Sequence, residues 1–250
     1  MISFVGAGPG DVDLITVKGR TLIEEADVVV YAGSLVDSAH LAFIGEDAEV
    51  YNSATMHLEE VLAVMIEADR SGKDVVRLHT GDPSLYGAIQ EQIDALESEG
   101  IAYQIIPGVS SFSAAAAAVG REFTLPGVSQ TVILTRRAGR TPVPERESLD
   151  ALAAHRASMS IFLSAGQIEA VVRDLSRAYP PKTPIAVVYK ASWDDEKIVR
   201  STLEDVVSDI EGEGIDRHAQ ILVGDFLDSP YEKSKLYDKH FTTGYRKGLK

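Results

Sequence analysis

The chain has 250 residues, 45% hydrophobic and 25% charged, a composition typical of a soluble globular protein with one large or two medium domains. Its net charge of −14 disfavours nucleic-acid binding, because neutralising phosphates supplies most of that affinity. The absence of cysteine excludes disulfides, thiolate metal sites and cysteine nucleophiles, and with no secretory signal or membrane-length apolar run we expect a cytoplasmic protein.

Apolar, β-branched runs alternate with helical patterns along the chain, which predicts an α/β fold. In the first half we expect strands at 3–6, 28–31, 75–78 and 103–106, and helices at 16–26, 58–71, 85–99 and 111–119. In the second half we expect strands at 131–135, 160–163, 185–189, 197–201 and 220–223, and helices at 168–179 and 203–211. The pattern also predicts an N-cap within 201–204 and a C-cap at Gly100.

The stretch GREFTLPGVSQ interrupts this alternation, since Gly120, Pro126 and Gly127 fall within eight residues and no clear periodicity remains. We therefore expect an N-terminal α/β domain over 1–120 and a C-terminal α/β domain over 121–250. A cleft between two such domains is a common place for a ligand.

A glycine-rich turn, Gly6-Ala7-Gly8-Pro9-Gly10, follows the first predicted strand. It resembles the start of a dinucleotide fingerprint, but Asp11 stands where the third glycine is needed and Pro9 lacks an N–H. The second strand also runs into YAGSLV without an acidic residue placed to hold a ribose. The turn therefore predicts a close backbone approach, and a nicotinamide or flavin enzyme is disfavoured.

Two further stretches follow predicted strands, so their residues can reach the same edge of a sheet. In RLHTGDPSLYG, Gly81 permits unusual backbone angles and Asp82 lies at a strand end, although Asp82 or Ser84 could simply cap a helix there. In IIPGVSSFSAAAAAVG, Ser110 or Ser111 begins a helix whose alanines allow close approach of a ligand or of another helix.

A cluster of arginines follows the strand expected at 131–135, in VILTRRAGRTPVPE. Arg136, Arg137 and Arg140 are notable in so acidic a chain, because guanidinium groups pair bidentately with carboxylates and phosphates. The alternative is a solvated basic loop. The six histidines show no metal-binding spacing, so we expect surface or capping histidines and no metal site.

Together, the stretches GAGPGDVDLITVKG, HTGDPSLYG, PGVSSFSAAAAA, SIFLS and AVVYKAS resemble the tetrapyrrole (corrin and porphyrin) methyltransferase family over nearly the whole chain. Within it, YAGSLV, LTRRAGRTPVPE, YKASWDDE and SKLYDKHF are similar to the precorrin-4 C11-methyltransferases of cobalamin biosynthesis, with or without cobalt in the ring. The resemblance implies the class III fold of this family: two α/β domains, a cleft that binds the methyl donor S-adenosylmethionine, and a homodimer.

By resemblance, the donor contacts lie on five stretches of the chain. The implied contacts are Pro9, Thr80, Gly81, Asp82, Leu85, Ser110, Ser111, Leu163, Ser164 and Ala191. Asp82 and Tyr86 are candidates for a base that takes a proton from the macrocycle. Because the tetrapyrrole substrate is a polyanion, we expect Arg136, Arg137 and Arg140, with Arg121, to face its propionates. Any cobalt would arrive inside the ring.

Three alternatives stay open at this point. A sister enzyme could methylate another ring position of a precorrin or of uroporphyrinogen. A non-catalytic tetrapyrrole carrier would not need the donor loops around Asp82 and Ser110, and a nucleotide-cofactor oxidoreductase conflicts with Pro9 and Asp11.

Overall fold

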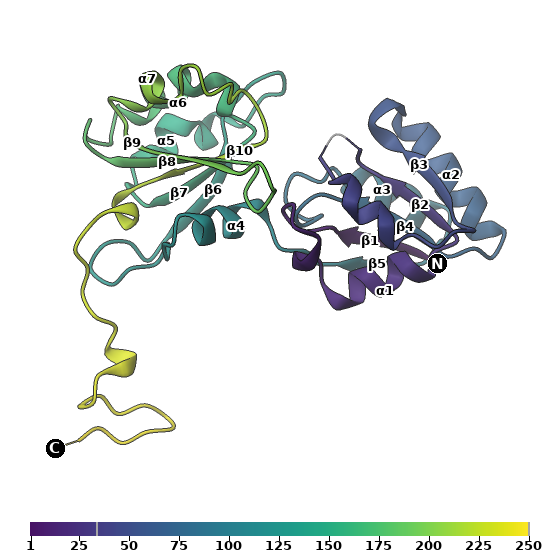
Figure 1. The fold of residues 1–250 in the computed structure, drawn as a ribbon, viewed down its shortest axis with the longest axis horizontal. Coiled ribbons are helices and arrows are strands. Elements are labelled where there is room, and N and C mark those ends of the chain that lie inside the picture. The colour runs from purple at the N-terminus through teal and green to yellow at the C-terminus, as the bar shows by residue number, and fades with distance from the viewer. Residues whose placement is uncertain (34, 250) are drawn as a thin grey trace. The chain divides into compact units, whose positions relative to one another are not determined.

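A computed structural model describes residues 1–33 and 35–249 (Figure 1). Ser34, within the YAGSLV stretch, and Lys250 lie outside the described residues. The chain forms two compact units: Met1–Ala115 with Lys190–Lys197, and Ala116–Tyr189 with Ile198–Lys250. The first unit therefore contains a short segment from far along the chain.

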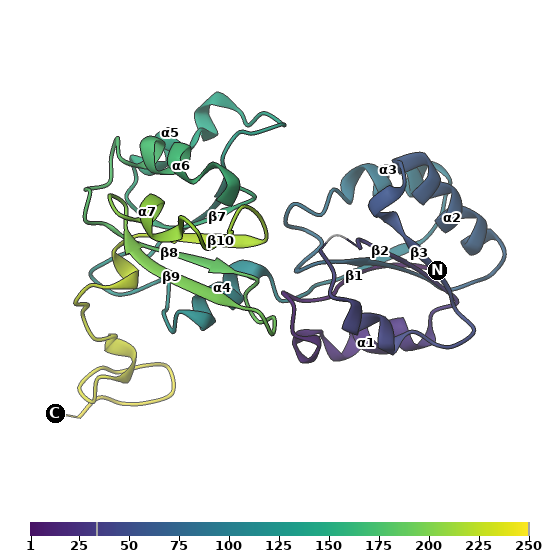
Figure 2. The same ribbon diagram turned by 45° about the horizontal axis from the view of Figure 1, so that its top comes forward.

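The first unit is a five-stranded parallel sheet in the order β3-β2-β4-β1-β5. Its strands are β1 (Ile2–Gly6), β2 (Val28–Tyr31), β3 (Glu49–Asn52), β4 (Val75–His79) and β5 (Tyr103–Ile106). Its helices are α1 (Val17–Glu25), α2 (Leu58–Arg70) and α3 (Gln90–Ser98). Figure 2 shows α1 on one side of the sheet and α2 and α3 on the other, which buries both faces as a parallel sheet requires.

The second unit is a mixed sheet in the order β6-β7-β10-β8-β9, in which β6 and β7 are parallel and β10 is antiparallel to both β7 and β8. Its strands are β6 (Val132–Arg136), β7 (Ser158–Phe162), β8 (Pro184–Tyr189), β9 (Lys197–Thr202) and β10 (Ala219–Val223). Its helices α5 (Leu149–Ala153), α6 (Ile168–Leu175) and α7 (Val206–Ile210) pack on one face (Figure 1). Helix α4 (Ser111–Ala118) crosses the boundary between the units.

The cores follow the strand alternation. In the first unit, Phe4 packs with Met65 and Leu96 towards α2 and α3, whereas Val5 packs with Ile23 towards α1. In the second unit the helix-covered face holds a larger apolar cluster. The opposite face carries buried polar groups that bond to one another: the Gln220 side-chain amide donates to Ser160 Oγ (2.8 Å).

The structure confirms the α/β class and most predicted elements, with differences at their ends. The short strand β3 was not predicted, and the expected N-cap within 201–204 is wrong, since Asp205 is the N-cap of α7. The helix expected at 85–99 begins only at Gln90, because Tyr86 and Ala88 have left-handed backbones (φ 59° and 50°). The prediction at Gly100 is confirmed: it follows the C-cap Glu99 with φ 68°.

The chain ends in an exposed arm, which includes the SKLYDKHF stretch (Figure 1). The Arg246 guanidinium donates to the carbonyls of Leu236 and Asp238 (3.0 and 2.7 Å), so the arm folds back on itself. Within residues 1–33 and 35–249, no helix is both long and apolar enough to cross a bilayer.

Two histidines expected at the surface are buried, which corrects that prediction. His40 is 1% exposed and His79 is 4% exposed. The Nε2 atom of His79 has no hydrogen-bond partner among the described residues. Burial, together with the nearby positive charge of Arg77, lowers the pKa of His79 to about 3.

His79 should therefore weaken the fold in acid. The unfolded chain takes up this proton near pH 6.5 and the folded one only near pH 3, so between those values the unfolded state binds more protons. From pH 7 to pH 5 we expect the group to remove about 2 kcal/mol from the free energy of unfolding. Urea unfolding of the wild type and of His79→Gln at both pH values measures this. Equal pH dependence in the two proteins would contradict the prediction.

Candidate functional site

Three loops of the first unit meet at the carboxyl edge of its sheet. Because β4, β1 and β5 are adjacent and parallel, the segments that follow them, 80–84, 7–10 and 107–111, lie side by side. This edge is where open α/β sheets bind ligands. The structure thus brings together most of the predicted donor contacts of the first half.

The first two loops are joined through their backbones. The Gly81 N–H donates to Gly8 O (2.7 Å), and the Gly8 N–H donates to Gly81 O (3.3 Å). Both glycines have left-handed backbones, with φ of 85° for Gly8 and 60° for Gly81. A side chain at either position would strain this pairing. The backbone conformation therefore accounts for both glycines, and no bound diphosphate is needed to explain them.

Glycines also permit the contact with the third loop. A Cβ atom on Gly6 would lie 2.6 Å from Gly81 O and 2.7 Å from the Gly108 Cα. A Cβ on Gly108 would overlap Gly81 O and lie 2.9 Å from the Gly6 Cα. All these atoms belong to the backbone and cannot move aside, so the edge is closed by contacts that only glycine allows.

The carboxylate of Asp82 ties the second loop to the third. Its Oδ2 accepts the Gly108 N–H (3.0 Å), and its Oδ1 accepts the Ser84 N–H (2.9 Å) and the Ser84 hydroxyl. The alternative of a helix cap at Asp82 or Ser84 is therefore wrong: the Leu85 N–H donates to Asp82 O (3.2 Å) within a local turn. No helix begins here.

Tyr86, the other base candidate, lies on the left-handed segment before α3 and is 45% exposed. Ser110 is buried, and its carbonyl accepts the N–H groups of Ser113 and Ala114 at the start of α4. Thr80 is partly exposed beside Gly81. A Cβ built on Gly81 would lie 3.7 Å from the Ser110 Cα, an ordinary van der Waals contact, so the second and third loops pack against each other here.

His40, which the sequence did not single out, supports the first loop from behind. Its Nε2 lies 2.8 Å from Ala7 O, as expected for an N–H donating to this carbonyl. The ring stands edge-on to Phe43, and the segment Ser38–Phe43 forms a 3₁₀ helix that holds it there. A buried histidine at this distance fixes the turn that carries Pro9.

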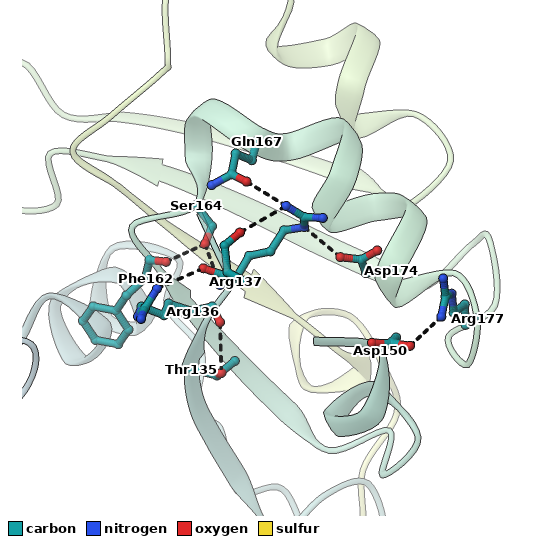
Figure 3. Close-up of polar contacts among 10 residues, drawn as sticks. Thr135, Arg136, Arg137, Asp150, Phe162, Ser164, Gln167, Asp174 and Arg177 are labelled. Atoms are coloured by element: carbon teal, nitrogen blue, oxygen red, sulfur yellow. Dashed lines mark hydrogen bonds and ion pairs between the residues drawn. The ribbon is translucent and has the colours of Figure 1, made fainter. Parts of the chain in front are cut away.

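In the second unit, Leu163 and Ser164 follow β7; Figure 3 shows Ser164 beside Arg137. Leu163 was expected within the strand, but it lies just beyond it with φ 52° and is 66% exposed. Ser164 is fully buried; its hydroxyl donates to Phe162 O (2.7 Å) and accepts the Arg137 N–H (3.0 Å). The exposed apolar side chain is thus Leu163, while the Ser164 hydroxyl holds the loop.

Arg136, which ends β6, and Arg137 and Arg140, which follow it, differ in their partners (Figure 3). Arg136 donates to Pro142 O (2.7 Å) and Thr141 O (3.2 Å). Arg137 forms an ion pair with Asp174 (2.7 Å) and donates to the Gln167 side chain (2.7 Å). Arg140 is exposed and makes no hydrogen bond or ion pair with the described part of the chain.

Arg121 lies away from these three. It lines a cavity of about 610 Å³ with Lys182, Pro184 and Arg200, at the amino end of β8. The β6–β7 register pairs Arg136 with Phe162, at the carboxyl ends of those strands. Since β10 runs antiparallel to both β7 and β8, β6, β7 and β8 share one direction, and Arg121 is at the opposite edge of the sheet from Arg136.

The comparisons with known proteins identify the class. Residues 1–207 match the family model of the tetrapyrrole (corrin/porphyrin) methylases, and this chain belongs to that family. It is 57% identical to a cobalt-precorrin-4 C(11)-methyltransferase of Methanocaldococcus jannaschii, over 100% of this chain and 97% of the relative.

Solved structures agree. The X-ray structure of a cobalt precorrin-4 methyltransferase, a cobalamin biosynthetic enzyme, has a TM-score of 0.89 and 50% identity, covering 91% of this chain and 96% of that one. Uroporphyrin-III C-methyltransferase from Thermus thermophilus, complexed with S-adenosyl homocysteine, has a TM-score of 0.76 and 27% identity, covering 90% and 98%. The family and the fold implied by the sequence motifs are thereby confirmed.

Proposed function

We propose that this protein is an S-adenosylmethionine-dependent methyltransferase of cobalamin biosynthesis that methylates C11 of cobalt-precorrin-4 or precorrin-4. The observation that carries the proposal is the 57% identity, over the full length, with a relative of that name. The loops at the carboxyl edge of the first sheet support it, since backbone hydrogen bonds and glycine contacts hold them together where open α/β sheets bind ligands.

The donor supplies a methyl carbon on a sulfonium, which a ring carbon attacks in line as the C–S bond breaks and its electron pair leaves with sulfur. The protein has to hold the two reacting carbons about 3–3.5 Å apart and keep water out. We propose that Pro9, Thr80, Gly81, Asp82 and Leu85 hold the donor. The further contacts are Ser110, Ser111, Leu163, Ser164 and Ala191.

The proposed substrate carries carboxylates, and the guanidinium groups of Arg136, Arg137 and Arg140 are suited to pair with them. Arg140 is the member whose guanidinium makes no bond within the described part of the chain, whereas Arg136 and Arg137 already have partners. We therefore expect Arg140→Ala to raise the tetrapyrrole KM about threefold at low salt, with less effect at high salt.

Arg137→Ala should behave differently. Breaking its partly buried pair with Asp174 leaves that carboxylate without its partner, so we expect a loss of about 2 kcal/mol in the free energy of unfolding. Steady-state kinetics at two ionic strengths and urea unfolding of both variants separate binding from stability. A tetrapyrrole KM for Arg140→Ala equal to that of the wild type at low salt would contradict the role assigned to Arg140.

The test of function has two stages. Calorimetry with S-adenosylmethionine and S-adenosylhomocysteine comes first; binding of neither compound would refute the methyltransferase and leave a tetrapyrrole carrier. Transfer from methyl-labelled donor to cobalt-precorrin-4 and to metal-free precorrin-4, with the product position determined by NMR, comes second. Methylation at another carbon would identify a sister enzyme instead.

We also propose that the active protein is a cytoplasmic homodimer, as the family resemblance implies. Sedimentation equilibrium should give twice the chain mass of 27.0 kDa. A single species of 27.0 kDa at working concentration would refute the dimer without affecting the proposed reaction.

A further inference from the structure

The segment Lys190–Lys197 packs with the first unit, although β8 and β9 on either side of it belong to the second sheet. Its contacts are with the loop after β1. The Trp193 indole N–H donates to Pro9 O (2.8 Å), and the Asp11 N–H donates to Ser192 Oγ (3.1 Å). Two hydrogen bonds thus join the turn at residues 9–11 to Ser192 and Trp193, which lie more than 180 positions further along the chain.

The Trp193 ring also packs closely against Gly10. A Cβ atom on Gly10 would be 2.8 Å from the ring Cγ and would overlap two further ring atoms. The glycine is therefore required for the ring to approach, and the ring in turn restricts the most flexible residue of the turn. The conformation of Pro9-Gly10 is determined by the indole as much as by β1.

Contacts with Lys190 hold Trp193 in place. The Trp193 backbone N–H donates to Lys190 O (2.9 Å), and the Lys190 ammonium lies 5.0 Å from the centroid of the Trp193 ring. Lys190 and Ser192 both have left-handed backbones (φ 46° and 72°), and the Ser192 N–H donates to the Glu196 carboxylate (2.7 Å). Backbone strain of this kind persists only where surrounding contacts fix it.

We infer that Trp193 is a positioning residue for the methyl donor. The indole of Trp193 holds Pro9 through its hydrogen bond. Ala191 lies two residues before Trp193 in the segment that this bond ties to the first unit. Both Pro9 and Ala191 are proposed donor contacts. Trp193 acts through these residues and touches no reacting atom. This inference rests on the proposed function. Under it, the Trp193 side chain sets the relative position of two donor contacts that are far apart in the sequence.

The test compares two variants that each lose one hydrogen bond to a buried carbonyl. Trp193→Phe keeps an aromatic ring but loses the donor to Pro9 O. Tyr179→Phe loses the hydroxyl that donates to Ala157 O (2.6 Å) in the second unit, and neither of these residues is a proposed donor contact. Calorimetry with S-adenosylhomocysteine gives the dissociation constant and the stoichiometry separately.

For Trp193→Phe we expect the dissociation constant for S-adenosylhomocysteine to rise about fivefold at unchanged stoichiometry, with a parallel rise in the donor KM. The tetrapyrrole KM should change less. For Tyr179→Phe we expect a lower Tm and an unchanged dissociation constant. A purely structural role for Trp193 would instead lower the stoichiometry, through a smaller folded fraction, and leave the dissociation constant unaltered.

Ser192→Ala provides a second variant should Trp193→Phe fold poorly, because it removes only the acceptor of the Asp11 N–H. We expect a smaller loss of donor affinity. Trp193 is the only tryptophan in the sequence, so its fluorescence in the wild type should change as the donor site fills.

Unchanged donor affinity in Trp193→Phe and Ser192→Ala, with no fluorescence change at saturation, would overturn the inference while leaving the proposed function intact. If the wild type itself binds neither S-adenosylmethionine nor S-adenosylhomocysteine, the proposed function fails, and with it the role assigned to Trp193.

Discussion

Gly108→Ala should lower the free energy of unfolding by about 3 kcal/mol and weaken donor binding at least tenfold. The added methyl group would overlap Gly81 O and lie 2.9 Å from the Gly6 Cα. Since one atom belongs to the backbone of a neighbouring loop and the other to the end of β1, the third loop can relieve the overlap only by moving away from both. Urea unfolding and calorimetry with S-adenosylhomocysteine measure the two effects.

Gly45→Ala is the matched control in the same unit. A Cβ there meets only Glu24 O, at an ordinary 3.5 Å, and Gly45 is not among the residues with positive φ. We expect a change in stability within about 0.5 kcal/mol and unchanged donor affinity. If Gly108→Ala behaved like Gly45→Ala, the loops would not be closed by glycine contacts as described.

Asp82→Ala should weaken donor binding at least tenfold and lower the free energy of unfolding by about 2 kcal/mol. It removes the acceptor of the Gly108 and Ser84 N–H groups and so leaves two loops unconnected. Asp82→Asn keeps one carbonyl oxygen as an acceptor and should fall between the wild type and Asp82→Ala.

The same variants decide whether Asp82 also acts as a base. A base contributes about 10²–10⁴ to the rate, so its loss would lower kcat by that factor while the dissociation constant for S-adenosylhomocysteine stayed near that of the wild type. The hydrogen bonds of both carboxylate oxygens favour the other outcome, in which affinity falls most. Ser84→Ala, which removes only a hydroxyl, should change affinity little.

The sequence predicted the interior strands well, because buried β-branched runs have few alternatives. Strand 28–31 coincides with β2, and strand 75–78 lacks only the last residue of β4; both lie inside the sheet order. It did not predict β3, whose exposed edge residues Glu49 and Asn52 show no apolar run. The predicted helix began five residues before α3, at 85, because the residue types do not indicate that Tyr86 and Ala88 adopt left-handed backbones.

For the candidate site, local patterns predicted the loops but not their supports. The turn around Asp82 follows from Gly81 and Pro83, whereas its bond to Gly108 depends on the strand order of the sheet. Neither His40 nor Trp193 lies near the first turn in sequence, so no spacing rule could connect them with Ala7 and Pro9. Likewise, Asp174 as the partner of Arg137 required the packing of α6.

The packing of Lys190–Lys197 with the first unit has a consequence for folding during synthesis on the ribosome. The five strands of the first sheet are complete once residue 106 has emerged, but the turn at Pro9 gains its indole partner only after residue 193. Contacts between such distant residues carry a large loop-closure cost and form late. The nascent first unit should therefore fold its sheet early and expose an unfinished rim to chaperones until the second half of the chain has left the exit tunnel.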